Sequence, residues 1–272
     1  MIVADALVAG YGETTIIDGL ELAIEPGTIT TLVGPNGCGK STLLKCLSGA
    51  FERTSGSVTL HGDEVSSLSR REIAQRLAVL PQSPVVPEFL TVLRLVEQGR
   101  FAAYGAMGML RSRTDDAVTR ALEITAMTGF ADRAVTSLSG GERQRAWMAL
   151  TIAQDTDTLL LDEPTTYLDV GYQLDVLDLV RTLNREHTTT VVMVLHDLNQ
   201  AVSYSDRIVA MSNGQIVADG APGDVITVEL LRDVFEVDAS LVDDPRTGRP
   251  VMVPHTSTRP SPDRRTAITA SG

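Results

Sequence analysis

The most constraining feature of this sequence is a glycine-rich segment between an apolar run and a helix-like one. Residues 34–42 read Gly-Pro-Asn-Gly-Cys-Gly-Lys-Ser-Thr, which matches the pattern G-x-x-x-x-G-K-[ST]. Residues 29–33 are typical of a buried strand, and residues 43–47 are typical of a helix. Such a loop turns several backbone N–H groups into one hollow, where the helix N-terminus favours phosphate. A tight turn without a ligand is the alternative, but the flanking strand and helix favour a phosphate-binding loop.

Two side chains of this loop have a predicted chemical role. Lys40 is placed to reach the β- and γ-phosphates of a nucleotide, and the Ser41 hydroxyl is placed to bind Mg²⁺. The predicted cofactor-binding residues of the loop are Gly34, Asn36, Gly37, Cys38, Gly39, Lys40, Ser41 and Thr42.

Composition limits what the chain can bind. A hydrophobic fraction of 43% over 272 residues predicts a sizeable core in one large or two small domains. The formal net charge of -12 argues against broad nucleic-acid binding, which needs a basic surface. It leaves room for a small basic site that holds one nucleotide.

The cysteines and the apolar runs indicate the compartment. Cys38 and Cys46 are eight residues apart, too far along a helix for a disulfide, so both should be free thiols of a reducing compartment. Cys38 at a helix N-terminus could be a reactive thiolate, but a small packed residue is the preferred interpretation. No apolar run approaches a membrane span and no signal segment is visible. We therefore expect a cytosolic chain that reaches a membrane only through a partner.

The order of elements predicts an α/β fold with an insertion. Residues 1–30 are β-like and contain Tyr11, in a predicted loop where an aromatic ring could stack on adenine or simply pack locally. Residues of about 88–150 are helical in an otherwise β-α-β chain and form an inserted helical subdomain. Residues 225–234 form a further helix. Residues 255–272 have little apolar content, and we expect a disordered C-terminal tail after a domain of residues 1–254.

Two acids follow a second buried strand. Residues 158–161 are Thr and three leucines, and Asp162 and Glu163 come next. An Asp at the end of such a strand beside a phosphate loop is where Mg²⁺ is held, and the following Glu could activate an attacking water. Acidic turn residues without function are the alternative for either acid alone.

Three further positions need an explanation. Ser139 and Glu142 have the spacing of a capping box, but Gly140 and Gly141 between them cost helix stability. Two glycines are expected where something approaches the backbone closely, and a helix start suits phosphate. His196 ends a β-branched strand, at the sheet edge where ligands bind in open parallel sheets.

Together these motifs resemble the ATP-binding cassette (ABC) ATPases over about residues 1–254. The resemblance makes residues 34–42 the Walker A loop, Gln82 the Q-loop residue and residues 138–142 the signature motif. Residues 159–162 resemble Walker B and residues 167–169 the D-loop. The implied fold is a P-loop NTPase core with an antiparallel β subdomain and an inserted helical subdomain.

The resemblance also implies a role for each candidate residue. It makes Glu163 the catalytic carboxylate, His196 the switch histidine and Tyr11 the adenine-stacking aromatic. The implied catalytic residues are Glu163, His196, Lys40 and Gln82; the implied Mg²⁺ ligands are Ser41, Gln82 and Asp162; the implied ATP contacts outside the loop are Tyr11, Gln82, Asp162, Ser139, Gly140 and Gly141.

Residues 162–169 and 196–201 are similar to ATPases of ferric siderophore importers. The resemblance therefore implies ATP hydrolysis that drives uptake through integral-membrane permease subunits at the cytoplasmic face of the membrane. It also implies a head-to-tail dimer of two copies and, indirectly, a substrate-binding protein, without nucleic acid. Tyr172 and Arg94 depart from that group, which often has His and an acid there.

Other interpretations remain at this stage. Vitamin B12 and haem importers share much of the pattern. A soluble ABC protein of chromatin, repair or translation usually carries a coiled-coil insertion or two cassettes, and neither is visible here. A P-loop kinase or GTPase leaves the signature motif and His196 without a role.

Overall fold

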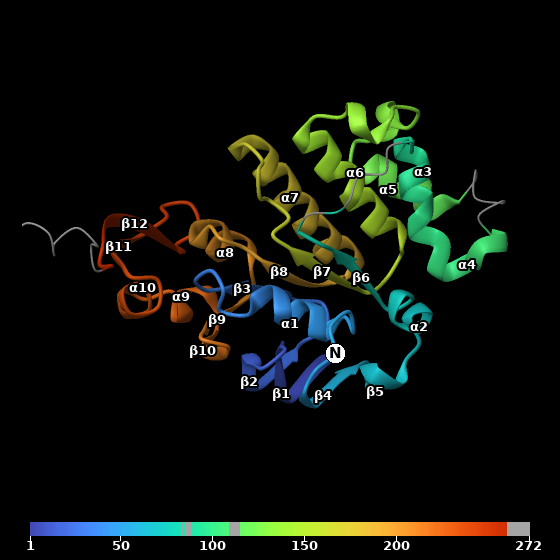
Figure 1. Ribbon diagram of the computed structural model, residues 1–272. Helices are drawn as coiled ribbons and strands as arrows, with labels where there is room; N and C mark the ends of the chain where they lie inside the picture. The colour runs from blue at the N-terminus through green and yellow to red at the C-terminus, as the bar shows by residue number, and fades with distance from the viewer. Residues whose placement is uncertain (83, 85–88, 109–114, 260–272) are drawn as a thin grey trace, which may run out of the picture.

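The computed structural model describes residues 1–82, 84, 89–108 and 115–259 (Figure 1). A six-stranded sheet with the order β10-β9-β3-β8-β7-β6 forms its centre. Strand β10 pairs antiparallel with β9, and the other neighbouring pairs are parallel. The strands are β3 (Ile29–Val33), β6 (Leu77–Leu80), β7 (Thr158–Asp162), β8 (Thr190–Val194), β9 (Arg207–Ser212) and β10 (Gln215–Gly220).

Both faces of this sheet are covered, which explains why every residue of β3, β7 and β8 is buried. Leu32 faces the layer that contains Leu43 and Leu47 of α1 (Lys40–Leu47). Val33, the next residue of β3, faces the layer that contains Leu177 of α7 (Val170–His187). Alternate residues of one strand therefore contribute to two separate cores.

An antiparallel sheet with the order β2-β1-β4-β5 packs on α1. Its strands are β1 (Ile2–Tyr11), β2 (Thr14–Ile24), β4 (Ser55–Leu60) and β5 (Asp63–Glu64). Tyr11 is the last residue of β1, paired with Thr14. The sequence places it in a loop, and this is wrong by one residue because the turn begins at Gly12. A short 3-10 helix (Val65–Ser67) and α2 (Arg70–Ala74) lead from this sheet to β6.

A helical block lies at one end of the molecule (Figure 1). Its apolar cluster includes Val96, Ala121 and Ala149 and is separate from the two cores of the sheet. The block contains α3 (Val92–Glu97), α4 (Phe101–Gly108), α5 (Asp116–Ile124), α6 (Gly140–Ala153) and the 3-10 helices Gln98–Arg100, Thr128–Phe130 and Val135–Ser137.

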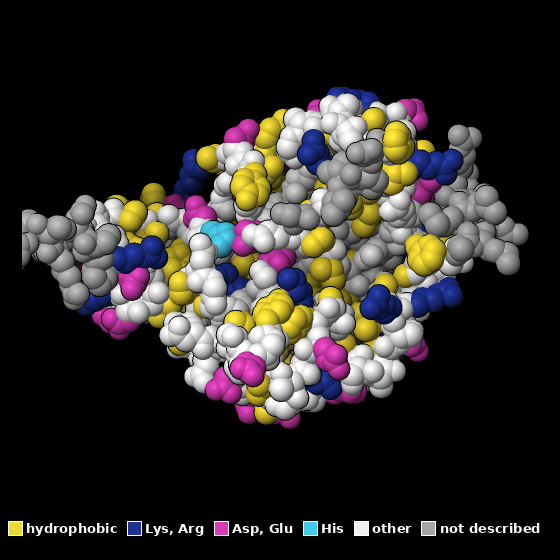
Figure 2. All heavy atoms as spheres, in the orientation of Figure 1, with side chains coloured by type: hydrophobic (Ala, Val, Ile, Leu, Met, Phe, Trp, Pro, Cys, Tyr) yellow, Lys and Arg dark blue, Asp and Glu magenta, His cyan; other side chains and the backbone are white. Residues whose placement is uncertain are grey.

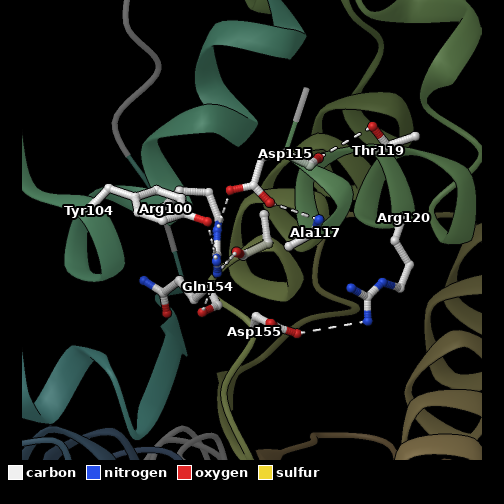
Figure 3. A network of polar contacts seen from close by, with 9 residues as sticks. Arg100, Tyr104, Asp115, Ala117, Thr119, Arg120, Gln154 and Asp155 are labelled. Carbon is white, nitrogen blue, oxygen red and sulfur yellow. Dashed lines mark hydrogen bonds and ion pairs between the residues drawn. The ribbon is translucent and has the colours of Figure 1, made fainter. Parts of the chain in front are cut away.

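Arg100 ties the ends of three helices of this block together (Figure 3). Its Nε donates to Asp115 at 2.8 Å, and its Nη1 donates to the carbonyls of Ala153 and Gln154 at 3.1 and 3.2 Å. Asp115 in turn caps α5 by accepting from the N–H of Ala117. One guanidinium thus satisfies the C-terminal carbonyls of α6 and fixes the start of α5.

The C-terminal part follows α8 (Leu198–Tyr204) and the β9–β10 hairpin at the opposite end from the helical block (Figure 1). It comprises α9 (Pro222–Val225), α10 (Val228–Asp233), β11 (Val237–Asp243) and β12 (Pro250–Ser257). The helix expected over residues 225–234 is confirmed as α10, Val228–Asp233, but its start is wrong by three residues, because Ile226 and Thr227 have extended backbone and separate α9 from α10.

The sequence also starts the disordered tail too early. Residues 255–257 belong to β12, where His255 lies 2.7 Å from the Ser240 hydroxyl of β11. No hydrophobic pattern marks this strand in the sequence, because the strand is largely exposed. Its pairing with β11 keeps it ordered. Residues 260–272 lie outside the described residues.

Among the described residues, no helix combines the length and apolar character that crossing a membrane requires. Cys38 and Cys46 are both buried and free of a disulfide, as expected. On the face seen in Figure 2, acidic and basic side chains are interspersed with hydrophobic ones.

Candidate nucleotide site

The site residues meet because four parallel strands end at one edge of the sheet. Val194 of β8 is level with Leu32 of β3 on one side and with Asp162 of β7 on the other. Leu80 of β6 is level with Leu161. The loop after β3, Gln82 after β6, Glu163 after β7 and His196 after β8 therefore leave the sheet as neighbours.

The glycines of the loop after β3 are needed for its curl. Gly34 has a φ of 149°, and a Cβ there would lie 2.2 Å from the carbonyl oxygen of Met211. Gly39 is the N-cap of α1 with a φ of 107°, a backbone conformation that residues with a Cβ rarely adopt. The N-terminus of α1 thus opens directly into the loop.

Lys40 lies across the loop and is only 6% exposed. Its ammonium donates to the carbonyls of Gly34 and Pro35 at 2.8 and 2.9 Å. The Cys38 sulfur, 3.7 Å from the same ammonium, is buried behind the loop. Cys38 is therefore the small packed residue that the sequence favours over a reactive thiolate.

Ser41 and Asp162 join the loop to the end of β7. The Ser41 hydroxyl donates to Asp162 Oδ1 at 3.0 Å. Burial raises the pKa of Asp162 above its ordinary value; the Ser41 bond opposes this, and the charge of Glu163 adds to it. A hydroxyl and a carboxylate oxygen are hard ligands that fit Mg²⁺. A bound cation would also offset the cost of burying the Asp162 charge.

Glu163 has an unusual backbone and three side-chain partners. Its φ of 53° is rare for a residue other than glycine. Its Oε1 lies 2.6 Å from Nε2 of His196, and its Oε2 accepts from the Thr166 hydroxyl at 2.9 Å. Burial raises the pKa of Glu163, but hydrogen bonds from His196, Gln82 and Thr166 outweigh it and leave the pKa below its ordinary value.

A cavity of about 270 Å³ opens in front of these groups. Tyr11 forms one wall, half exposed, with its ring held against Phe51 at 4.7 Å between centroids. Lys40, Glu163 and His196 reach the same cavity, which is completed by Ile16, Asn36, Gly37, Gly39, Ser41 and Thr42.

Ser139, Gly140 and Gly141 do not line this cavity. Ser139 caps α6 in the predicted capping box, with Glu142 N–H bound to its hydroxyl at 3.3 Å. A Cβ on Gly140 would meet open space. The other predicted site residues line the cavity or contact a residue that does: Gly34 and Cys38 contact Lys40, Asp162 contacts Ser41 and Gln82 contacts Glu163. Residues 139–141 lie apart from them.

Packing within the chain explains why position 141 is a glycine. A Cβ at this position would lie 2.9–3.0 Å from the ring of Tyr172 on α7. The sequence attributes both glycines to the close approach of a ligand. The Tyr172 ring is a second reason for a glycine at position 141, and the role of the Gly141 backbone N–H in binding stays a prediction. Gly140 has no such neighbour and keeps its original interpretation.

Sequence reasoning missed two contacts of the site. Thr166 is three residues after Glu163, a spacing that a turn brings together, so its bond to the carboxylate could have been found. Gln144 of α6 donates to the carbonyl of Pro164 at 2.8 Å and links the signature helix to the segment after β7. No local pattern signals that bond.

The family of the chain follows from comparison with known proteins. The model of the ABC transporter family matches residues 17–166, more than half of the chain. The fold described above is that of an ABC ATPase. The chain therefore belongs to the ABC transporter family as an ATP-hydrolysing protein.

Individual relatives agree with this assignment. The chain is 49% identical to the petrobactin import ATP-binding protein FpuD of Bacillus anthracis, across 92% of this chain and 91% of the relative. It is 42% identical to the ferric enterobactin transport ATP-binding protein FepC of Escherichia coli (strain K12), across 94% and 95%. The dimeric structure of MJ0796, a bacterial ABC transporter cassette, superposes with a TM-score of 0.73 at 28% identity, across 82% and 99%.

Proposed function

We propose that this chain is the ATPase subunit of an importer that takes up an iron–siderophore complex through a separate membrane permease. The observation that carries the proposal is the cavity where the loop of residues 34–42 meets Glu163 and His196. The petrobactin and enterobactin relatives support the cargo. The chain would act at the cytoplasmic face of the membrane, bound to the permease.

ATP would lie with its phosphates over the N-terminus of α1. The backbone N–H groups of residues 36–42 would bind the phosphates, and Lys40 would exchange its carbonyl partners for phosphate oxygens. Tyr11 would stack on the adenine, since its ring borders the same cavity. Packing against Phe51 holds the ring in place, and its half-exposed position at the cavity leaves it accessible to adenine.

Hydrolysis requires a base that is ionised near neutral pH. The lowered pKa of Glu163 supports this role, and its carboxylate would accept a proton from the attacking water. His196 would hold that carboxylate before ATP binds and would contact the γ-phosphate afterwards. Mg²⁺ held by Ser41, Asp162 and Gln82 would neutralise charge on the phosphates.

A second copy would complete the site. Ser139 and Gly140 lie outside the cavity of their own chain, and the open space at Gly140 suits the approach of a phosphate. We infer a head-to-tail dimer in which residues 139–141 of each copy donate to the γ-phosphate bound by the other. The dimeric cassette among the relatives supports this arrangement.

The permease would dock beside the helical block. A groove of about 400 Å³ lies there, between Ile73, Leu77, Val79 and Gln154. Phe89 and Phe101 are exposed nearby in the chain, the former by 93%. Gln82 would link this face to the nucleotide through its bond to Glu163, and a substrate-binding protein would act on the permease from the other side.

The cargo is tested by uptake in a host strain that lacks this gene. Uptake of labelled ferric siderophores should fall and be restored by the wild-type gene but not by Glu163→Gln. Loss of haem or cobalamin uptake with intact siderophore uptake would favour those cargoes instead. A non-transport role would be favoured if no membrane protein co-purifies with the chain and all three uptakes persist.

A further inference from the structure

The first turn of α7 contacts three separate segments of the site. Tyr172 packs its ring on Gly141 of the signature motif. Gln173 contacts the segment before α7 and also the helix after His196. No other described role of the site uses these two side chains, and neither lines the cavity.

Gln173 uses both ends of its amide. Its Nε2 donates to the carbonyl of Leu168 at 3.0 Å, and its Oε1 accepts from Nε2 of Gln200 at 2.6 Å. Both bonds are partly buried, where a neutral hydrogen bond is stronger than in water. The pair of glutamines therefore bridges residues 168 and 200.

Gln200 continues the connection to the switch histidine. Its backbone N–H is bound by the side chain of Asp197, the N-cap of α8, at 3.0 Å. Asp197 follows His196, whose ring contacts Glu163. Leu168 and His196 are therefore connected through two side-chain amides and one helix cap.

The other end of this connection faces outward. Tyr167 is 92% exposed with a φ of 65°, and Val170 is 70% exposed. The segment of residues 167–170 therefore projects from the chain, where a second molecule can press on it. Its backbone is held from the inside by Gln173 and by Asp169, which caps α7.

We propose that Gln173 and Gln200 are positioning residues that couple the segment of residues 167–170 to His196. The proposal rests on the proposed head-to-tail dimer, in which the second copy would press on this segment. Contact with that copy would then orient His196 toward the γ-phosphate. Hydrolysis would follow only when both copies are in place.

The test separates the two bonds of Gln173 in the full-length chain. Gln173→Glu keeps an acceptor for Gln200 but cannot donate to Leu168, and Gln173→Met loses both bonds. Gln200→Lys keeps a donor for Gln173, whereas Gln200→Glu does not. Gln98→Glu, an exposed Gln-to-Glu change in the helical block, is the matched control.

Steady-state ATPase kinetics with Mg-ATP and thermal unfolding are measured for each variant. We expect kcat to fall about tenfold or more in Gln173→Glu, Gln173→Met and Gln200→Glu, with KM within about twofold and Tm nearly unchanged; tenfold corresponds to about 1.4 kcal/mol of activation free energy. Gln200→Lys should retain most of the wild-type kcat. The Hill coefficient for ATP should fall toward one in the three impaired variants.

A wild-type kcat in Gln173→Met would overturn the proposal. A lower kcat that comes together with a changed KM and a lower Tm would also overturn it, because a purely structural contact predicts that result. Failure of the proposed chemistry gives a different result. In that case Glu163→Gln turns over at the wild-type rate, whatever the glutamine variants do.

Discussion

Nε2 of His196 lies 2.6 Å from Oε1 of Glu163, although the two residues follow different strands. Their contact arises because β7 and β8 are parallel neighbours in register, with Asp162 level with Val194. The structure thereby places an imidazole against the carboxylate that the sequence selects as the base.

Removing the imidazole should move the pH dependence of hydrolysis. Burial raises the pKa of Glu163, and the bond from His196 is the largest effect that lowers it. His196→Ala should therefore raise this pKa in the ATP-free enzyme. Since the base acts only when ionised, the acidic limb of the kcat/KM–pH profile, which reports the free enzyme, should move to higher pH. His187→Ala, at the end of α7, is the control. An unmoved limb in His196→Ala would mean that Glu163 does not titrate in the rate-limiting step.

Lys40 should contribute mainly to binding of the nucleotide. Charge-assisted hydrogen bonds contribute roughly 1.5–3 kcal/mol, so Lys40→Ala should weaken ATP affinity by about tenfold or more. Lys45→Ala, an exposed lysine of α1, should keep the affinity within about twofold. Equilibrium binding of a fluorescent ATP analogue measures both. Equal affinities in the two variants would exclude the phosphate contact of Lys40.

The two glycines of the signature motif should behave differently. Gly141→Ala places a methyl group 2.9–3.0 Å from the Tyr172 ring and should cost about 1–3 kcal/mol of unfolding free energy. Tyr172→Ala in the same chain should recover much of that cost. Gly140→Ala meets open space and should leave stability equal or slightly higher, while ATPase activity falls. Urea denaturation measures the stabilities, and equal costs at both positions would contradict the packing described here.

The Arg100–Asp115 pair should make stability depend on pH. Burial would raise the pKa of Asp115, but the bonds from Arg100 and the N–H of Ala117 outweigh it and hold the pKa below its ordinary value. A carboxyl with a lowered folded-state pKa stabilises the fold above the unfolded value of about 3.9, and that contribution is lost as the pH falls below it.

Asp115→Asn keeps an acceptor for the α5 cap but removes the charge. It should lower the unfolding free energy by roughly 3 kcal/mol at pH 7, because the pair is largely buried. The difference from the wild type should shrink as the pH falls through the folded-state pKa of Asp115. Asp116→Asn is the neighbouring control, and a pH-independent difference would contradict the ion-pair account. Denaturation at several pH values provides the measurement.

Much of this site is predictable because its signals are local. The loop of residues 34–42, the strand that ends in Asp162 and the capping box at Ser139 each depend on residues within a few positions of one another. Contacts between distant elements leave no such signal. The ring of Tyr172 over Gly141 and the bond between Gln173 and Gln200 depend on how α6, α7 and α8 pack.

The same reasoning explains where the structure predicted from the sequence differs from the observed fold. A helix over residues 225–234 fits the hydrophobic pattern, but Thr227 caps α10 and breaks it. Residues 255–257 have a composition typical of a disordered segment, and their order comes from pairing with β11, which composition does not report.

The most direct test of the central claim is the ATPase activity of Glu163→Gln beside the wild type, with the oligomeric state followed in Mg-ATP. General-base removal typically costs 10²–10⁴-fold, so we predict that turnover falls by about a hundredfold or more while ATP still binds. The variant should accumulate as an ATP-bound dimer, and the exposed-surface control Glu186→Gln should not. Turnover at the wild-type rate, or a variant that binds ATP yet stays monomeric, would contradict the account.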